Sequence, residues 1–471
     1  MELLTRNKFR NQLARGIRIF NKLRNHPQQY PDFNKIRPLG PGKAACYAPF
    51  SSMYIASNGD VRACCMNTEQ IYGNLKNQSL NEIWNSETRK SLCKSSTQYN
   101  LPSGCQVCIE NFENGNAANS TAILYDQYRT KHKYPQRIDF ELSLACNFDC
   151  RMCMFSSHQN HGIKLQNTYK FDDLFLNQLS PFLKHIKLAG FYGGEPFLIP
   201  IYYKIWDRIQ AQNPKAFITV QSNGSILNDK ILNYLEKGKF QINFSIDSLQ
   251  KERFEFIRDK ADFNQVMENF QIINKISQKN KLTQSIAVCP MKQNLGEMGD
   301  LVEFANKHNT LIYFNSVDTE GFKIAELNEN ELKQHIKKLA SQTIDDKTKI
   351  ERLNYERYQA LIKSLESTLS TIKLQEKKRN TFHQFSSSKF VNILINKLNN
   401  QTETQARKKL ESIINQLPKS FELNEEKTER LKLMSGKKIN KFVLSHTETE
   451  LIQSFNNYLN TGKFIEEEKQ S

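Results

Sequence analysis

The sequence contains no long hydrophobic run. No stretch of the 471-residue chain approaches the roughly 18–20 consecutive apolar residues that a membrane-spanning helix needs. The first 25 residues also build no apolar run after their positive charges, so a secretory signal is not expected. These absences favour a cytoplasmic protein without a transmembrane segment.

Cysteine is absent after residue 289, and the ten cysteines of the chain gather before that point. Six lie within residues 46–108 and three within residues 146–153. Secreted disulfide scaffolds are short and rich in loops, whereas this chain is long and has helix and strand patterns. In a cytosolic protein, clustered cysteines are better explained as ligands of a metal or an iron–sulfur cluster.

Acidic residues are too few to balance the basic ones, and the formal net charge is +17. Residues 1–40 hold nine Lys/Arg against two Asp/Glu, and Phe9, Leu13, Ile17 and Phe20 follow one stripe of a basic amphipathic helix. Such a helix can dock on the protein itself, lie on an anionic membrane or direct targeting to an organelle. No nucleic-acid motif accompanies the charge, so a nucleic-acid partner is not expected.

Composition divides the chain into four zones. They are a basic amphipathic helix and linker (1–40), a Cys-rich unit (43–130), a zone of alternating strands and helices (131–320) and a helical C-terminal extension (321–471). In the last zone, Tyr355, Tyr358, Leu361 and Leu365 recur at spacings of three and four, which predicts one long helix with mostly solvated faces.

The third zone predicts an α/β fold. Strands separated by helices of this length pair in parallel through crossover connections. Six strands are too few for a closed eight-stranded barrel, so we expect an open or partial (β/α)6 barrel. The expected strands are 137–144, 185–192, 216–221, 240–246, 283–288 and 311–317, and the expected helices are 171–183, 201–211, 228–236, 263–278 and 295–307.

Three cysteines follow the first expected strand of this zone. Cys146, Cys150 and Cys153 have the spacing C-x3-C-x2-C. Three thiolates can hold three irons of a four-iron cluster and leave the fourth iron open to an external molecule. A zinc site usually has four ligands, and His158 and His161 keep that alternative open.

The triplet resembles the cysteine motif of the radical S-adenosylmethionine (SAM) superfamily, and the resemblance runs through residues 137–317. Gly193-Gly194-Glu195-Pro196, at the end of the second strand, is similar to the GGEP motif with which that family binds the methionyl amine of SAM. Two glycines allow a close approach of the backbone to a ligand, and backbone carbonyls with a carboxylate suit an ammonium group.

Further similarities lie at the carboxyl ends of later strands, where α/β barrels place their active sites. Ser222 and Asn223 resemble the family's TNG segment, and Ser245 and Asp247 its SID segment, in which the serine contacts SAM. Arg258 lies where related enzymes have an arginine facing the SAM carboxylate. Turn formation, helix capping and a solvated charge are the structural alternatives for these residues.

The Cys-rich unit resembles the twitch form of the SPASM auxiliary-cluster domain. Cys46, Gly59, Cys64, Cys105 and Cys108 follow its pattern of C-x9–15-G-x4-C, a gap and C-x2-C. Four thiolates suit a fully ligated auxiliary 4Fe-4S cluster, although a zinc ribbon has the same spacing.

Two further features of this unit bear on the resemblance. Cys65 can replace Cys64, whereas Cys93 and Cys289 fit no ligand pattern and are expected to be buried thiols. In the family this domain ordinarily follows the barrel, whereas here it precedes it.

The resemblance implies a radical SAM enzyme with two clusters. The open iron binds SAM, one electron from the reduced cluster cleaves it, and the 5′-deoxyadenosyl radical abstracts hydrogen from a substrate. A flavodoxin or ferredoxin would supply the electron. The expected substrate is a peptide or protein side chain; the alternatives are radical oxidation of a carbohydrate-like small molecule and a non-catalytic iron–sulfur scaffold.

Overall fold

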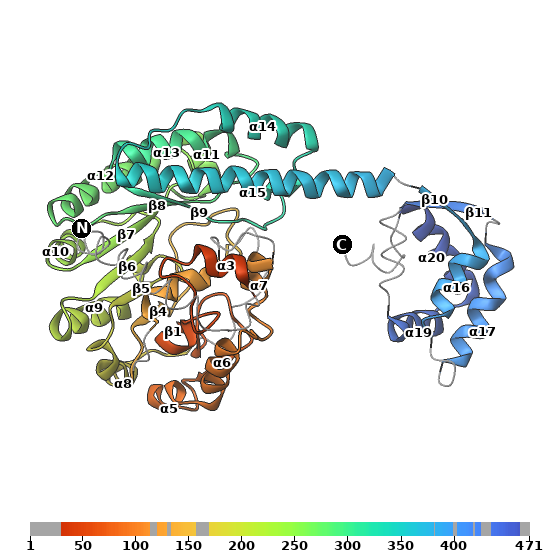
Figure 1. The fold of residues 1–471 in the computed structure, drawn as a ribbon, viewed down its shortest axis with the longest axis horizontal. Helices are drawn as coiled ribbons and strands as arrows, with labels where there is room; N and C mark the ends of the chain where they lie inside the picture. The colour runs from red at the N-terminus through yellow and green to blue at the C-terminus, as the bar shows by residue number, and fades with distance from the viewer. Residues whose placement is uncertain are drawn as a thin grey trace. The chain divides into compact units, whose positions relative to one another are not determined.

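The computed structural model describes residues 30–113, 120–129, 133–156, 169–380, 382–398, 403–417, 420–424 and 435–461 (Figure 1). The chain divides into two compact units. Unit 1 comprises Met1–Glu326 and Lys337–Ile362, and unit 2 comprises Leu327–Ile336 and Lys363–Ser471. The basic helix predicted around Phe9–Phe20, together with His158 and His161, lies outside the described residues.

Unit 1 is built on one sheet of nine strands in the order β3-β2-β1-β4-β5-β6-β7-β8-β9. Each neighbouring pair from β4 to β9 is parallel, as the predicted crossover connections require. The six strands are β4 Arg137–Glu141, β5 Leu188–Phe191, β6 Phe217–Ser222, β7 Phe240–Ser245, β8 Ser285–Val288 and β9 Leu311–Phe314. All six coincide with predicted strands, which confirms the partial-barrel prediction.

Helices cover the outer face of these strands (Figure 1). Phe191 of β5 packs on Trp206, and Phe244 of β7 packs on Phe270, with ring centroids 5.5 and 5.1 Å apart. The helices are α8 Asp173–Leu183, α9 Pro200–Gln212, α10 Asp229–Lys237, α11 Lys251–Ile257, α12 Phe263–Lys279 and α13 Met298–Lys307. Side chains preceding three of them accept backbone N–H bonds as N-caps, namely Asp172, Asn228 and Asp262.

The other face of the sheet carries polar side chains at alternating positions. On β6, Ile218 and Val220 are buried while Thr219 and Gln221 are partly exposed. Gln221 Nε2 donates to Ser245 Oγ at 2.8 Å, so neighbouring strands are also linked by side chains on this face. Such alternation follows from the two-residue period of a strand.

The Cys-rich unit extends the same sheet. Its strands are β1 Ser52–Ala56, β2 Asp60–Arg62 and β3 Ile71–Asn74, and β1 pairs in parallel with β4. The β1–β2 turn has Gly59 at φ +88°, as its predicted role in a hairpin turn requires. Its helices are α3 Pro31–Ile36, α4 Ala48–Ser51, α5 Leu80–Trp84, α6 Glu87–Thr97, α7 Gln106–Glu113 and the 3-10 helix η2 Thr121–Tyr128. The sheet therefore has three strands more than the barrel alone.

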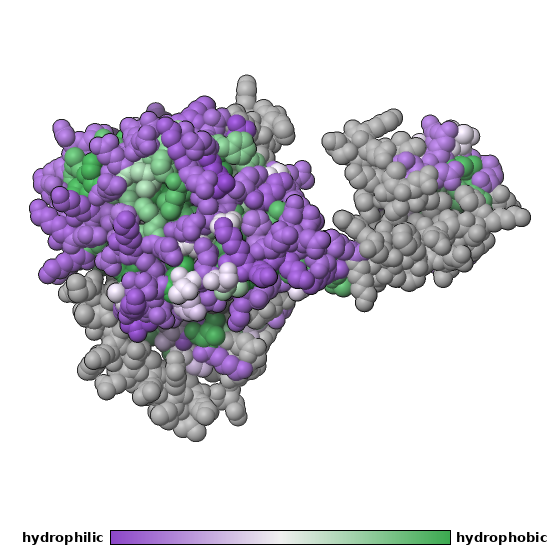
Figure 2. Space-filling model, turned by 90° about the horizontal axis from the view of Figure 1, so that it is seen from above, coloured by the Kyte–Doolittle hydropathy of each residue, from purple (hydrophilic) through white to green (hydrophobic). Residues whose placement is uncertain are grey.

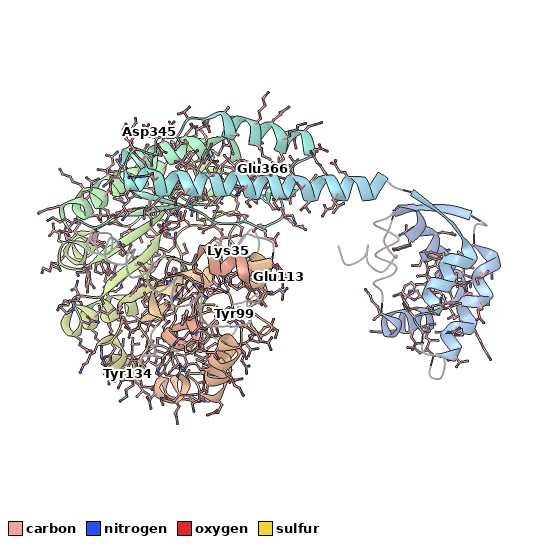
Figure 3. All side chains as sticks on the ribbon, viewed as in Figure 1. Lys35, Tyr99, Glu113, Tyr134, Asp345 and Glu366 are labelled. Carbon is pink, nitrogen blue, oxygen red and sulfur yellow. The ribbon has the colours of Figure 1, made fainter. Side chains whose placement is uncertain are left out.

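The Cys-rich unit also begins earlier than its predicted start at residue 43. Phe33 of α3 stacks on Phe112 of α7 with ring centroids 4.1 Å apart, and both belong to one buried cluster with Tyr99. Figure 3 labels Lys35, Tyr99 and Glu113 in this part of the molecule. Tyr30 and Phe33 thus belong to the hydrophobic core of this unit.

The C-terminal zone is mostly helical, as predicted, and few of the described side chains of its first two α-helices are buried. The long helix is α15 Lys349–Asn380, which follows α14 Glu329–Ser341. Beyond it, β10 Phe382–Ser386 pairs antiparallel with β11 Ser420–Asn424. The remaining helices are α16 Ser387–Ile395, α17 Thr404–Ile413, α19 Gly436–Ser445 and α20 Glu448–Thr461, and their buried side chains form a separate hydrophobic core.

The surface is predominantly hydrophilic. Figure 2 shows mainly polar residues on the face that it presents, in keeping with a mean hydropathy of −0.62. Among the described helices, none combines the length and the apolar character that a membrane crossing requires.

Candidate active site

The loop that follows β4 holds the cysteine triplet. Backbone bonds fix it to the segment after α11, with Asp149 N donating to Asp259 O at 2.9 Å and Arg151 N to Ile257 O at 3.0 Å. Thr319 Oγ1, beyond β9, donates to Met152 O at 2.8 Å. The loop is therefore held from two distant parts of the barrel.

Cys146, Cys150 and Cys153 all line one cavity of about 1050 Å³ at the carboxyl ends of the strands. Six of the nine residues predicted to bind the cofactor line it too, namely Gly193, Gly194, Ser222, Asn223, Ser245 and Arg258. Glu195, Pro196 and Asp247 are buried and are not among the lining residues.

The two glycines of the GGEP segment lie against the cysteine loop. A Cβ atom on Gly193 would stand 2.1 Å from Ser143 O, and one on Gly194 would stand 2.0 Å from Ala145 O. Gly193 also has φ +113°, which other residues rarely adopt. Glycine is required here because the backbone of this segment contacts the backbone of the loop.

Glu195 joins the end of β5 to the end of β6. Its Oε1 accepts from Ser222 Oγ at 3.0 Å and from Phe197 N at 3.1 Å, and its Oε2 accepts from Asn223 N at 2.7 Å. Burial raises the pKa of this carboxyl to about 7, against the opposing effect of these donors. The described contacts give Glu195 a positioning role within the protein.

Asn223 reaches the cysteine loop from β6. Its Nδ2 donates to Asn147 Oδ1 at 2.9 Å and lies 3.9 Å from Cys146 Sγ. Asn147 Nδ2 in turn donates to Ser225 Oγ at 2.8 Å. The segment after β6 thus orients the first cysteine of the triplet.

Asp247 and Arg258 form a buried ion pair, with Oδ2 and Nη2 2.7 Å apart. Arg258 Nη1 also lies 3.6 Å from Cys150 Sγ. Burial raises the pKa of the Cys150 thiol to about 11, and the charge of Arg258 opposes that rise. Arg258 is therefore buried and paired within the protein, so it is not the solvated charge that was the structural alternative.

Several residues of this cavity were not predicted from sequence. Cys289, which follows β8, lines it although it was expected to be an ordinary buried thiol. Its position at the carboxyl end of a barrel strand is the sequence feature that could have indicated a place in the site. Gln221, four residues of the cysteine loop (Met152, Met154, Phe155 and Ser156) and residues 316–320 also contribute to the lining.

The Cys-rich unit gathers the four predicted auxiliary ligands. Cys46, Cys64, Cys105 and Cys108 line one recess, and the other side chains around it are mostly apolar. Two donors address these sulfurs: Ala48 N lies 3.4 Å from Cys46 Sγ, and Asn67 Nδ2 lies 3.1 Å from Cys105 Sγ. Donors of this kind support cluster thiolates in iron–sulfur proteins.

The other two cysteines of this unit, Cys65 and Cys93, are not among the residues that line the recess. The side chain of Cys65 is exposed, and the charges that act on it include Arg137 and Asp139 of β4. Cys93 Sγ donates to Pro49 O at 3.3 Å. Among the described residues, no three His, Cys, Asp or Glu side chains converge on the site of a single metal ion.

Comparison with known proteins agrees with this geometry. The family model of the radical SAM superfamily matches residues 140–305, and that of the SPASM iron–sulfur cluster-binding domain matches residues 46–109. Residues 140–305 therefore form a radical SAM domain, and residues 46–109 form a SPASM domain. The radical SAM domain implies a 4Fe-4S cluster and SAM, and the SPASM domain implies an auxiliary iron–sulfur cluster.

Similar curated proteins include two GTP 3′,8-cyclases. That of Clostridium perfringens (strain SM101 / Type A) is 27% identical over 225 residues, which cover 46% of this chain and 68% of the relative. That of Campylobacter curvus (strain 525.92) is 26% identical over 188 residues, covering 39% of this chain and 56% of the relative. The chain thus spans between about half and two thirds of these relatives.

Similar solved structures are more distant. The enzyme anSMEcpe with bound AdoMet is 17% identical, with a TM-score of 0.34 over 43% of this chain and 58% of that chain. Streptococcus suis SuiB bound to precursor peptide SuiA is 14% identical, with a TM-score of 0.34 over 49% and 50%.

Proposed function

We propose that this radical SAM enzyme modifies a side chain of a peptide or protein. In this proposal Cys146, Cys150 and Cys153 hold the catalytic 4Fe-4S cluster, and Cys46, Cys64, Cys105 and Cys108 hold the auxiliary one. When bound, the reduced catalytic cluster supplies the electron that cleaves SAM, which provides the 5′-deoxyadenosyl radical for hydrogen abstraction.

The protein's own residues bind and orient the reactants. The Gly193-Gly194 backbone and the side chains of Ser222, Asn223 and Ser245 line the cavity beside the cysteine loop and are proposed to bind SAM. Glu195 is proposed to act indirectly, because it fixes the backbone of Asn223. A rigid, preorganised site of this kind favours one geometry for hydrogen abstraction and limits access of water.

The observation on which the substrate proposal depends is the exposed apolar pair Met154 and Phe155 in the cavity lining. The volume of the cavity, about 1050 Å³, is slightly above the range of about 300–1,000 Å³ that is usual for ligand pockets. The cavity therefore has space beside SAM for part of a second molecule. Met154 and Phe155 line the cavity, and they are 70% and 42% exposed to solvent.

Exposed large apolar side chains at a site suit an apolar partner, and methionine adapts to partners of varied shape. The lining also contains polar side chains such as Asp149, Lys260 and Glu320, which would suit a carbohydrate. The peptide proposal therefore depends on the two exposed apolar side chains, and the experiment below tests them directly.

Turnover of peptides by the full protein tests this proposal. Anaerobically reconstituted, reduced enzyme is incubated with SAM and short peptides encoded beside its gene, and the mass of the peptide is measured together with 5′-deoxyadenosine. We expect a modified peptide. Replacing Met154 and Phe155 by Ala should raise the KM for the peptide, whereas Leu174→Ala, an exposed apolar residue on α8 outside the cavity lining, should leave it unchanged.

The alternatives make different predictions in the same assay. Turnover of a small carbohydrate without modification of any peptide would favour the small-molecule function, and turnover of GTP would favour that of the cyclase relatives. Absence of SAM cleavage by protein that holds both clusters would favour the non-catalytic scaffold.

A further inference from the structure

The guanidinium of Arg258 lies between a buried carboxylate and a cysteine of the triplet. Its side chain is 8% exposed and that of Asp247 is 0% exposed. Nη2 is paired with Asp247 Oδ2 at 2.7 Å, and Nη1 lies 3.6 Å from Cys150 Sγ, within the range of an N–H···S hydrogen bond.

Asp247 is fixed in turn by its neighbours. Its Oδ1 accepts from Cys289 N at 2.6 Å, and its backbone carbonyl accepts from Asn294 Nδ2 at 2.8 Å. A buried carboxylate that is held in this way keeps its ion-pair partner close by, because an unpaired buried charge is costly. The arginine is thereby held with its other terminal nitrogen toward the thiol.

The described contacts use two of the five N–H groups of Arg258. Both terminal nitrogens have partners within the protein, and Nε is buried without a hydrogen-bond partner. A SAM carboxylate would need two adjacent N–H groups of the fork for a bidentate contact. The predicted contact with the SAM carboxylate is therefore tested beside the inference below.

Hydrogen bonds to sulfur and nearby charge both set the reduction potential of an iron–sulfur cluster. Reduction adds negative charge to the cluster, so a cationic donor at a ligand sulfur stabilises the reduced form more than the oxidised form. Loss of that donor makes the cluster harder to reduce.

We propose that Arg258, held by Asp247, is a positioning residue for the catalytic cluster that donates to Cys150 Sγ and raises the reduction potential of the cluster. This inference depends on the proposed assignment of Cys150 as a cluster ligand but not on the identity of the substrate.

Redox titration followed by electron paramagnetic resonance tests the inference on reconstituted full-length protein without SAM. The signal of the catalytic cluster is the one that Cys150→Ala removes. We expect Arg258→Gln to shift its midpoint potential to a more negative value. Arg258→Lys keeps the charge and one donor, so its shift should be smaller. Asp247→Asn removes a negative charge, so it should not reproduce the negative shift of Arg258→Gln.

Arg253→Gln is the matched control. Arg253 lies on α11 and pairs with Glu297, but it does not line the cavity, so its loss should leave the potential unchanged. Binding of SAM is measured in parallel. An unchanged potential in Arg258→Gln, with SAM affinity lost, would overturn the inference and favour the carboxylate role.

Two further outcomes are informative. Loss of the catalytic signal from Arg258→Gln, Arg258→Lys and Asp247→Asn alike would also overturn the inference, since the ion pair would then be needed for assembly of the site. A wild-type protein with no Cys150-dependent signal would contradict the proposed ligand set instead, which separates the two failures.

Discussion

At the scale of single residues, Glu195 shows how a motif residue is tied into the barrel. Its carboxylate is buried and accepts three hydrogen bonds, two from the Ser222–Asn223 segment and one from Phe197 in its own segment. One of these partners, Ser222, lies 27 residues further along the chain. The spacing of a motif does not reveal a partner at that distance, so this hydrogen bond could not be predicted from the sequence.

The raised pKa of Glu195 predicts a pH-dependent stability. Because its pKa is about 7 in the folded protein and 4.5 ordinarily, the folded protein holds a proton that the unfolded chain releases between these values. Over this range the contribution of Glu195 to the free energy of unfolding should fall by up to about 3 kcal/mol as pH rises.

Glu195→Gln, which cannot titrate, should abolish that contribution. Urea unfolding at a series of pH values from 4.5 to 7.5 measures the difference between the two proteins. A difference that does not change with pH would show that the three donors already keep this carboxyl ionised.

The cysteine triplet and the two glycines could be predicted because their roles follow from local spacing and backbone freedom. The structure brings them together, with Gly194 against the carbonyl of Ala145. The orientation of Asp247 toward Arg258 and the place of Cys289 in the cavity could not be predicted, since both depend on how separate strands come together.

At the scale of elements, the barrel strands were predictable and the joining of the two domains was not. All six parallel strands have the apolar runs and turn residues that mark a strand in sequence. The pairing of β1 with β4 joins segments about 85 residues apart, and no local pattern specifies such a partner. The short helix α11, Lys251–Ile257, was also missed.

The auxiliary recess predicts which cysteines of the Cys-rich unit bind iron. Reconstituted wild-type protein should hold about eight irons in two clusters, and Cys105→Ala should retain about four. Cys65→Ala is the matched control, because Cys65 neighbours Cys64 in sequence but does not line the recess. Iron and zinc analysis of the three proteins decides the matter; an equal loss of iron from both variants, or stoichiometric zinc, would contradict the assignment.

At the scale of the whole molecule, the C-terminal region is more than an appendage of helices. The 3 and 4 spacing of apolar residues correctly predicted the long helix α15. The β10–β11 pair was not predicted, because its strands are only five residues long and are separated by two helices. The core of this region lies entirely between Phe390 and Tyr458, among the described residues.

A chain that ends at Asn380 should therefore keep both clusters. This truncation removes the whole hydrophobic core between Phe390 and Tyr458 and leaves α15 intact. We expect an unchanged iron content and the loss of one transition from the thermal unfolding of the full protein. Loss of iron from the shortened chain would show that this region is required for assembly of unit 1.

The parallel pairing of β1 with β4 has a consequence for communication between the two proposed clusters. Five aligned residue pairs join the strands, so the cysteine loop after β4 and the Cys-rich unit around β1 are parts of one hydrogen-bonded framework. Electron tunnelling through protein weakens steeply with distance, and a sheet holds its strands at a nearly constant spacing. Any electron exchanged between the clusters would thus cross a gap fixed by the fold itself, at a rate independent of domain motion.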